Sequence, residues 1–157
     1  MAKKMHTFGY EGLNIDQFVL RLVDEGVRTV VDVRANPLSR KPGFSKRALS
    51  THLEGAGIKY IHVVEVGCPK PVRDRYKIDR NWSIYTKGFK AYLQGQSGAI
   101  DQIAKIAAKT KICLICFEAD HNFCHRSFVA DAVAAVTGIK VDHLKGRMSS
   151  EAAQVAA

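Results

Sequence analysis

Two stretches far apart in the chain each place charged or thiol side chains directly after a short apolar run. The first runs from Asp32 to Lys46, and the second runs from Cys116 to Arg126. In a parallel α/β sheet, ligands bind in the crevice outside the carboxyl ends of the strands. We therefore expect the two stretches to meet at one site, although they are distant in the sequence.

The first stretch combines cations with hydroxyl groups beside a predicted helix N-terminus, and the second stretch adds a further arginine. Guanidinium, ammonium, hydroxyl and free backbone N–H groups together bind phosphate or carboxylate groups. We predict an anion site on this basis. The predicted anion-binding residues are Arg34, Ser39, Arg40, Ser45, Lys46 and Arg126.

Carboxylates and a thiol accompany these cations, although a surface that only binds phosphate does not need them. Glu11, Glu65 and Glu118 each follow a predicted strand and are candidates for general base, nucleophile or metal ligand. Cys124 begins a predicted helix, where the helix dipole and a nearby arginine favour the thiolate. The predicted catalytic residues are Glu11, Glu65, Glu118 and Cys124, and the residues expected to line the pocket are Tyr10, Asp32, Cys116 and His125.

Structural roles compete with these assignments. Asp32 and Arg34 share one face of a strand, so an ion pair that only orients Arg34 is an alternative. Cys113 and Cys116 have the spacing of a metal-binding or redox pair, but on a strand they point to opposite faces and cannot share one ion. We therefore predict no metal site, and the sequence does not indicate a cofactor.

The apolar pattern predicts strands at 5–10, 28–34, 58–63, 111–117 and 139–144, separated by amphipathic helices. The segment 65–81 carries two prolines and several basic residues, which predicts a long exposed loop. Alternating strands and helices indicate a single-domain α/β fold, a three-layer sandwich with a mostly parallel sheet of about five strands. We place this domain at 1–145 and a flexible C-terminal tail at 146–157.

The chain has 157 residues, an apolar fraction of 46% and a formal net charge of +9, which favours a globular protein with an anionic partner. The expected partner is a nucleotide or nucleic acid. No apolar run is long enough to span a membrane, so we expect no membrane partner. The N-terminal residues lack the apolar core of a signal peptide, so we expect a cytoplasmic protein. In that reducing compartment the four cysteines are not expected to form structural disulfides. The sequence does not indicate an oligomeric state.

The chain resembles the uncharacterised family known as domain of unknown function 488. The resemblance covers most of the chain and rests on several motifs together. These motifs lie at 7–12, 31–46, 60–67, 116–118, 124–126 and 143–144. The resemblance implies a compact α/β domain of unassigned activity and carries over no catalytic residue.

Three functions remain open from the sequence. The first is an enzyme that acts on a phosphate-bearing substrate, which is a nucleotide or nucleic acid. The second is a noncatalytic nucleic-acid-binding module that uses the basic segment 70–90, with Tyr76, Trp82 and Tyr85 available for stacking. The third is a thiol redox or sulfur-transfer enzyme, which requires the sulfurs of Cys116 and Cys124 to lie within bridging reach.

Overall fold

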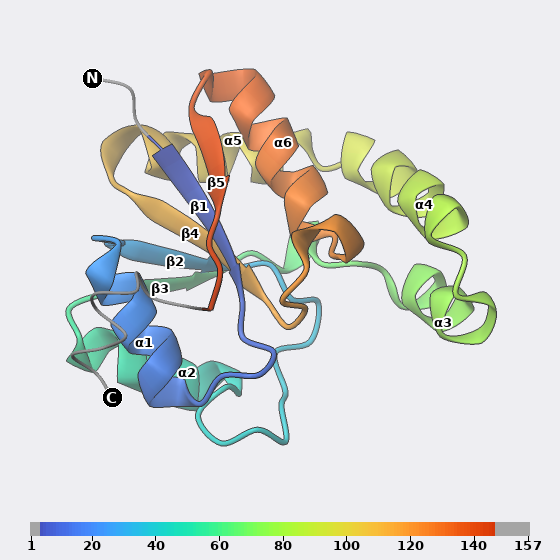
Figure 1. Ribbon diagram of the computed structural model, residues 1–157. Helices are drawn as coiled ribbons and strands as arrows, with labels where there is room; N and C mark the ends of the chain where they lie inside the picture. Colours follow the sequence, from blue (N-terminus) through green and yellow to red (C-terminus); the bar gives the residue numbers. More distant parts are fainter. Residues whose placement is uncertain (1–3, 147–157) are drawn as a thin grey trace.

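A computed structural model describes residues 4–146, and Figure 1 shows a central sheet covered by helices on both faces. The five strands are β1 (Lys4–Gly9), β2 (Thr29–Asp32), β3 (Lys59–His62), β4 (Ile112–Cys116) and β5 (Lys140–His143). They lie in the order β3-β2-β4-β1-β5, and every neighbouring pair is parallel. The predicted α/β sandwich is therefore confirmed.

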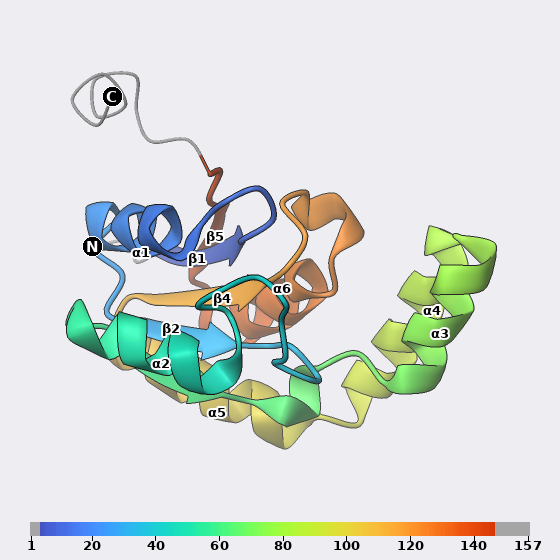
Figure 2. The same cartoon turned by 90° about the horizontal axis from the view of Figure 1, so that it is seen from below.

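Six α-helices connect the strands, together with the short 3-10 helices η1 (Val64–Val66) and η2 (His121–Phe123). The helices are α1 (Ile15–Asp24), α2 (Lys46–Gly55), α3 (Lys70–Asp79), α4 (Trp82–Gln94), α5 (Ser97–Lys109) and α6 (Arg126–Thr137). In Figures 1 and 2, α1 and α2 lie on one side of the sheet, and α5 and α6 lie on the other. The α3–α4 pair extends beyond the sheet.

Alternation along the strands builds two separate apolar cores. Phe8, Val30 and Cys113 pack on the α1–α2 side, whereas Val31 and Cys116 pack on the α5–α6 side. Because Cys113 and Cys116 belong to opposite cores, they cannot form a pair, as the strand period of two residues requires.

Local sequence signals explain where the first helix begins. The Asn14 side chain accepts a hydrogen bond from the Gln17 amide at 2.8 Å, and the Gln17 side chain accepts one from the Asn14 amide at 2.9 Å. This reciprocal capping box satisfies two amides that the helix itself leaves unpaired. Ser45 also precedes a helix, but its hydroxyl caps nothing and instead bonds both backbone polar groups of Ser39.

The prediction of a long loop over 65–81 is wrong, because α3 occupies most of that segment. Pro71 lies in the first turn of α3, where a missing N–H costs no hydrogen bond. Ion pairs one turn apart join Lys70 to Asp74 at 2.6 Å and Arg75 to Asp79 at 3.3 Å. The prolines therefore mark a helix start rather than a loop.

Two further sequence predictions concern the tail and the membrane. Apart from Gly146, the tail predicted at 146–157 lies outside the described residues. None of the helices in residues 4–146 has the length and apolar character needed to cross a membrane.

Close backbone approach fixes the loop that follows β4. A Cβ atom added to Gly9 would overlap the carbonyl group of Glu118, so only glycine fits at the end of β1. The Tyr10 and Glu11 amides donate to the Cys116 and Phe117 carbonyls at 3.1 and 2.8 Å. The carboxyl ends of β1 and β4 are therefore held against each other.

We predict that Gly9→Ala lowers the free energy of unfolding by at least about 2 kcal/mol, because the new methyl group overlaps backbone atoms that have no room to move. Gly98→Ala in α5 is the control, since an added Cβ there meets nothing within 4 Å. It should be neutral or slightly stabilising. Urea unfolding measures both, and equal effects of the two variants would contradict the close approach.

Candidate functional site

A cavity of about 540 Å³ opens beside the carboxyl ends of β1, β2 and β4 and is closed on its other side by α3 and the start of α4. We call it the carboxyl-edge cavity. Its lining residues are Tyr10, Arg34, Ala35, Asn36, Leu38, Ser39, Arg40, Cys68, Arg73, Tyr76, Lys77, Arg80, Trp82, Tyr85, Cys116, Phe117, Glu118, Phe123, Cys124 and His125.

The lining combines positive charge with aromatic rings. Five of the lining residues are Arg or Lys, and Glu118 is the single carboxylate among them. Six are Tyr, Trp or Phe. Phe117 and Phe123 are about half exposed, at 45% and 52%, although each ring also contacts one other aromatic ring. The cavity therefore suits a ligand that carries both negative charge and a flat or apolar group.

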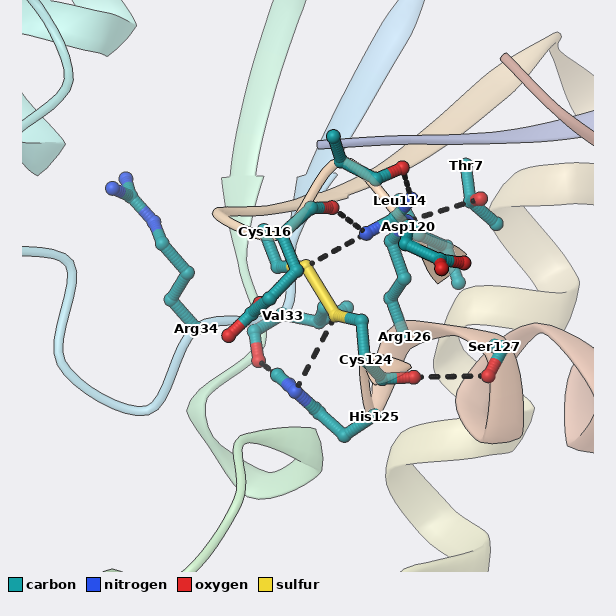
Figure 3. Close-up of a disulfide and its surroundings, with 12 residues drawn as sticks. Thr7, Val33, Arg34, Leu114, Cys116, Asp120, Cys124, His125, Arg126 and Ser127 are labelled. Atoms are coloured by element: carbon teal, nitrogen blue, oxygen red, sulfur yellow. Dashed lines mark hydrogen bonds between the residues drawn. A yellow bond between two sulfur atoms is a disulfide. The ribbon is translucent and has the colours of Figure 1, made fainter. Parts of the chain in front are cut away.

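Arg126 is completely buried behind the cavity, and Figure 3 shows its guanidinium lying between Thr7 and Cys116. The Nε atom donates to Thr7 Oγ1 at 3.1 Å, and Nη1 donates to the Glu118 carbonyl and lies 3.1 Å from Cys116 Sγ. Nη2 donates to the Ala119 carbonyl at 3.3 Å. Burial lowers the pKa of Arg126.

A disulfide joins Cys116 to Cys124 on the wall of the cavity (Figure 3). The Glu118 carboxylate lies 3.5 Å from Cys116 Sγ, and partial desolvation raises the pKa of that carboxyl group despite the nearby charge of Arg126. His125 Nε2 lies 2.7 Å from the Val33 carbonyl and donates to it, which leaves Nδ1 as an acceptor 3.9 Å from Cys124 Sγ. A disulfide, a carboxyl group and a fixed imidazole thus meet at one place.

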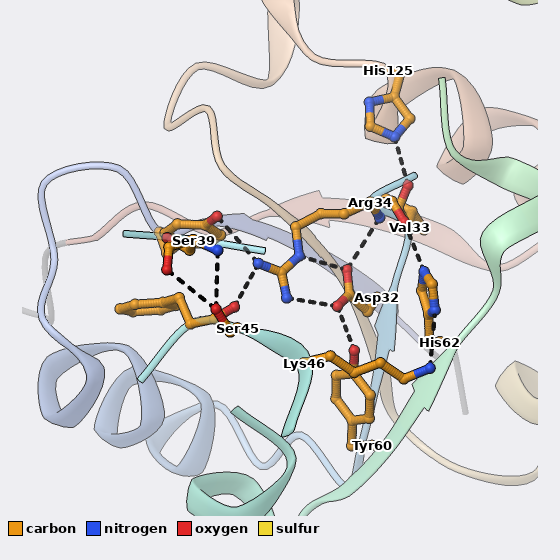
Figure 4. Close-up of polar contacts among 11 residues, drawn as sticks. Asp32, Val33, Arg34, Ser39, Ser45, Lys46, Tyr60, His62 and His125 are labelled. Atoms are coloured by element: carbon orange, nitrogen blue, oxygen red, sulfur yellow. Dashed lines mark hydrogen bonds and ion pairs between the residues drawn. The ribbon is translucent and has the colours of Figure 1, made fainter. Parts of the chain in front are cut away.

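Arg34 forms a second buried cluster, shown in Figure 4. Its Nε and Nη2 atoms donate to the two Asp32 carboxylate oxygens at 2.9 and 2.7 Å. Its Nη1 atom donates to the Phe44 carbonyl at 2.6 Å and to the Tyr10 hydroxyl at 3.2 Å. Burial alone would lower the pKa of Arg34, but the bonds and charge of Asp32 outweigh it and raise the pKa. Four of the five guanidinium donors are therefore already used.

The structure brings eight of the predicted site residues into the cavity lining and leaves six outside it. The lining contains Tyr10, Arg34, Ser39, Arg40, Cys116, Glu118, Cys124 and His125. The residues outside are Glu11, Asp32, Ser45, Lys46, Glu65 and Arg126.

The outer group has structural contacts or faces solvent. The Glu11 carboxylate accepts a hydrogen bond from the Ala119 amide at 3.0 Å, and Glu65 is exposed in η1. The Lys46 ammonium lies 3.4 Å from His62 Nδ1. The Ser45 hydroxyl bonds Ser39, as described above. Glu118 is therefore the predicted catalytic carboxylate that reaches the cavity.

The expected position of Cys124 at a helix start is corrected by the structure. Helix α6 begins at Arg126, with His125 at the N-cap, so Cys124 precedes the helix. The guanidinium of Arg126 contacts the sulfur of Cys116 rather than that of Cys124. The charge of Arg126 therefore lies beside Cys116 and not, as predicted, beside Cys124.

Sequence reasoning did not include Arg73, Lys77 and Arg80 among the site residues, although all three line the cavity. They lie on or directly after α3, which was predicted to be a loop. Their spacing of four and three residues, with Tyr76 between them, places them along one side of a helix. This spacing is the signal that could have identified them.

Two groups within residues 4–146 bring three potential metal-ligand atoms within 4.8 Å of one another. One contains Cys116, Glu118 and Cys124, and its sulfurs would have to be reduced before they bind an ion. The other contains His6, Glu25 and Asp142. In that group the Glu25 carboxylate is already paired with Arg21 at 2.6 Å. Neither group is a complete tetrahedral protein site.

Comparison with known families identifies the chain. The family model described as "Domain of unknown function DUF488" matches residues 14–133. The chain belongs to this family. Neither the curated proteins nor the solved structures contain a match. The matched range of the DUF488 family includes all lining residues of the carboxyl-edge cavity except Tyr10.

The buried His125 predicts a pH dependence of stability. Burial lowers its pKa from 6.5 to about 4 in the folded protein, and the charges of Arg126 and Arg73 act in the same direction. Because the unfolded chain takes up the proton first, the free energy of unfolding should fall by roughly 3 kcal/mol as the pH falls from 6.5 to 4. His143, whose pKa is also lowered to about 4, contributes with the same sign.

His125→Gln should lose the His125 part of this pH dependence while it keeps a donor for the Val33 carbonyl. Urea unfolding between pH 7 and pH 4 measures the difference, with His52→Gln on the exposed side of α2 as the control. A pH profile of His125→Gln parallel to that of the wild type would show that His125 is not held neutral.

Proposed function

We propose that this DUF488 protein is an enzyme that acts on a phosphate-bearing substrate, a nucleotide or nucleic acid, in the carboxyl-edge cavity. The observation that supports it best is the composition of the cavity lining, which combines cations without an ion-pair partner, aromatic rings and a single carboxylate. The cations would bind phosphate, and a base can stack on the aromatic rings. The carboxylate can serve as the acid–base group that a reaction needs.

The phosphate-binding cations in this proposal are Arg40, Arg73, Lys77 and Arg80. None of them forms an ion pair in the described part of the chain, whereas Arg34 is held by Asp32. Within residues 4–146, the Nε atom of Arg73 is buried and has no hydrogen-bond partner. A buried donor of this kind costs free energy until an acceptor reaches it, so an anionic oxygen would stabilise it.

The base-binding group would be the rings of Phe117 and Phe123. Trp82 already stacks on Tyr85, with ring centroids 4.5 Å apart and an angle of 13° between the planes. It also contacts Phe123 at 5.6 Å. The partly exposed rings of Phe117 and Phe123 are therefore the ones available for a base to stack on, and the contact with Trp82 holds the Phe123 ring in place.

Glu118 is the acid–base group of the proposal. Desolvation raises the pKa of its carboxyl group, which moves it toward the range in which a carboxyl group exchanges protons near neutral pH. A carboxylate beside phosphate-binding cations would weaken binding, so its position is better explained by chemistry than by affinity.

A noncatalytic nucleic-acid-binding module is the alternative, and the distribution of charge bears on it. Lys70 and Arg75 on α3 pair with acidic neighbours, while the free cations of this helix line the cavity. Cations that form no ion pair and lie together in a cavity favour binding of a small phosphate-bearing group over binding along the backbone of a long nucleic acid. The alternative therefore becomes one of the outcomes of the experiments below.

Trp82 allows a direct binding test because it is the single tryptophan of the chain and lines the cavity. We expect nucleoside triphosphates and short single-stranded oligonucleotides to change its fluorescence on titration. Arg73→Gln and Lys77→Gln should each weaken binding about tenfold, since each removes a charge-assisted bond. The matched control is Lys105→Gln, an exposed lysine on α5 that does not line the cavity.

Two results would contradict this part of the proposal. One is an unchanged spectrum at millimolar nucleotide and at low salt. The other is an equal loss of affinity in Lys105→Gln, which would mean that net charge rather than the cavity attracts the ligand.

Glu118→Gln separates binding from catalysis. It should bind the same nucleotide at least as tightly as the wild type, because it removes a negative charge, and it should turn over any converted substrate about 100-fold more slowly. Phosphorus NMR and mass spectrometry of wild-type incubations with nucleotides and oligonucleotides provide the readout. Tight binding without any product in the wild type would favour the noncatalytic module.

A further inference from the structure

We infer that Cys116 and Cys124 form a redox-active dithiol, in which reduction leaves Cys116 as a thiolate paired with Arg126. This function goes beyond the proposed action on a phosphate-bearing substrate and rests on different atoms. Both cysteines line the carboxyl-edge cavity and are almost fully buried, at 1% and 2% exposed, so a reductant must approach them through that cavity.

The buried charge of Arg126 supports this assignment. Its side chain is 0% exposed, and in residues 4–146 it forms no ion pair with a carboxylate. Its partners are two backbone carbonyls, the Thr7 hydroxyl and, at 3.1 Å, Cys116 Sγ. A buried guanidinium is costly without an anion. The sulfur of Cys116 becomes that anion when the disulfide opens.

The surroundings of Cys124 are different. Its sulfur lies 3.9 Å from Nδ1 of His125, the nitrogen that the bond to Val33 leaves without a proton. A neutral imidazole nitrogen accepts a hydrogen bond from a thiol, so Cys124 is stabilised as the protonated partner. The two sulfurs therefore differ as leaving groups, and Cys116 leaves more readily than Cys124.

The reaction follows from this inequality. A thiolate of an external dithiol attacks Cys124 Sγ, the Cys116–Cys124 bond breaks, and Cys116 leaves as the thiolate beside Arg126. The second thiol of the reductant then attacks its own sulfur in the mixed disulfide and releases Cys124. The protein gains two electrons, and the dithiol loses two and becomes a disulfide. One proton of the dithiol goes to Cys124 and the other to solvent.

Other groups around the pair set how far the thiolate is stabilised. Glu118 opposes it, since its carboxylate lies 3.5 Å from Cys116 Sγ. Asp120 acts in the same sense by interacting with Arg126, while Arg73 lies on the cavity wall and adds positive charge. Removing the Glu118 charge should therefore make the Cys116 thiolate more stable without touching the disulfide itself.

The test reduces the native protein with dithiothreitol and follows alkylation of each cysteine against pH by peptide mass spectrometry. In Cys124→Ser, Cys116 should titrate with a midpoint at least one pH unit below the roughly 8.5 of a free thiol. In Cys116→Ser, Cys124 should titrate at or above that value. The buried Cys113, whose pKa is raised by desolvation, is the internal control and should react slowest.

The native disulfide should also open in dithiothreitol without denaturant and form again with oxidised glutathione. Glu118→Gln should move the Cys116 midpoint further down, and the variant keeps the fold because the backbone carbonyl that accepts from Arg126 is unchanged. The inference is overturned if Cys116 titrates like a free thiol or if only the unfolded protein can be reduced. An unchanged midpoint in Glu118→Gln would overturn the assignment of Cys116 as the thiolate.

Discussion

The buried guanidinium of Arg126 is the constraint on which the carboxyl edge of the sheet depends. It binds the carbonyls of Glu118 and Ala119, so the loop after β4 is held against the body of the protein. It also binds Thr7 in the middle of β1, which ties the loop to the neighbouring strand. The absence of a side chain at Gly9 is what lets that loop approach so closely. The positions of the disulfide and of the Glu118 carboxylate follow from this arrangement.

A second buried arginine performs the same task on the other side of the edge. Arg34 is bound by Asp32, whose carboxylate also accepts a bond from the Tyr60 hydroxyl at 2.5 Å. This network fixes the loop after β2 by way of the Phe44 carbonyl. Arg34 is therefore held by structural contacts, and in the described part of the chain the cavity cations that form no ion pair lie on or directly after α3 and in the loop that carries Arg40.

The fold could be predicted well from the sequence because the signals for strands and helices lie within short segments of the chain. Apolar runs and helical stripes located all five strands, and the capping pair Asn14 and Gln17 located the start of α1. The prediction is wrong at α3, because two prolines indicate a loop although a helix tolerates proline at its N-cap and in its first turn. That failure removed Arg73 and Lys77 from the predicted site.

The candidate site was predictable only in part, because contacts across the sheet decide it. Residue types near strand ends predict a site at this edge, and of the residues named for it Arg40, Glu118 and the two cysteines line one cavity. They could not indicate that Arg126 turns toward Cys116, since this depends on the path of the loop between them. Nor could they separate Glu118 from Glu11, whose carboxylate is used by the Ala119 amide.

The charge of Arg126 organises this edge, and we infer that the sulfur of Cys116 balances that charge. The most direct measurement is the free energy of unfolding of wild type and Arg126→Gln, each in oxidised and in reduced form. Comparison within each redox state cancels the effect of the cross-link on the unfolded chain. We predict a loss of about 3 kcal/mol in the oxidised protein and at least about 1 kcal/mol more in the reduced protein. An equal loss in the two states, or no loss in either, would contradict the account.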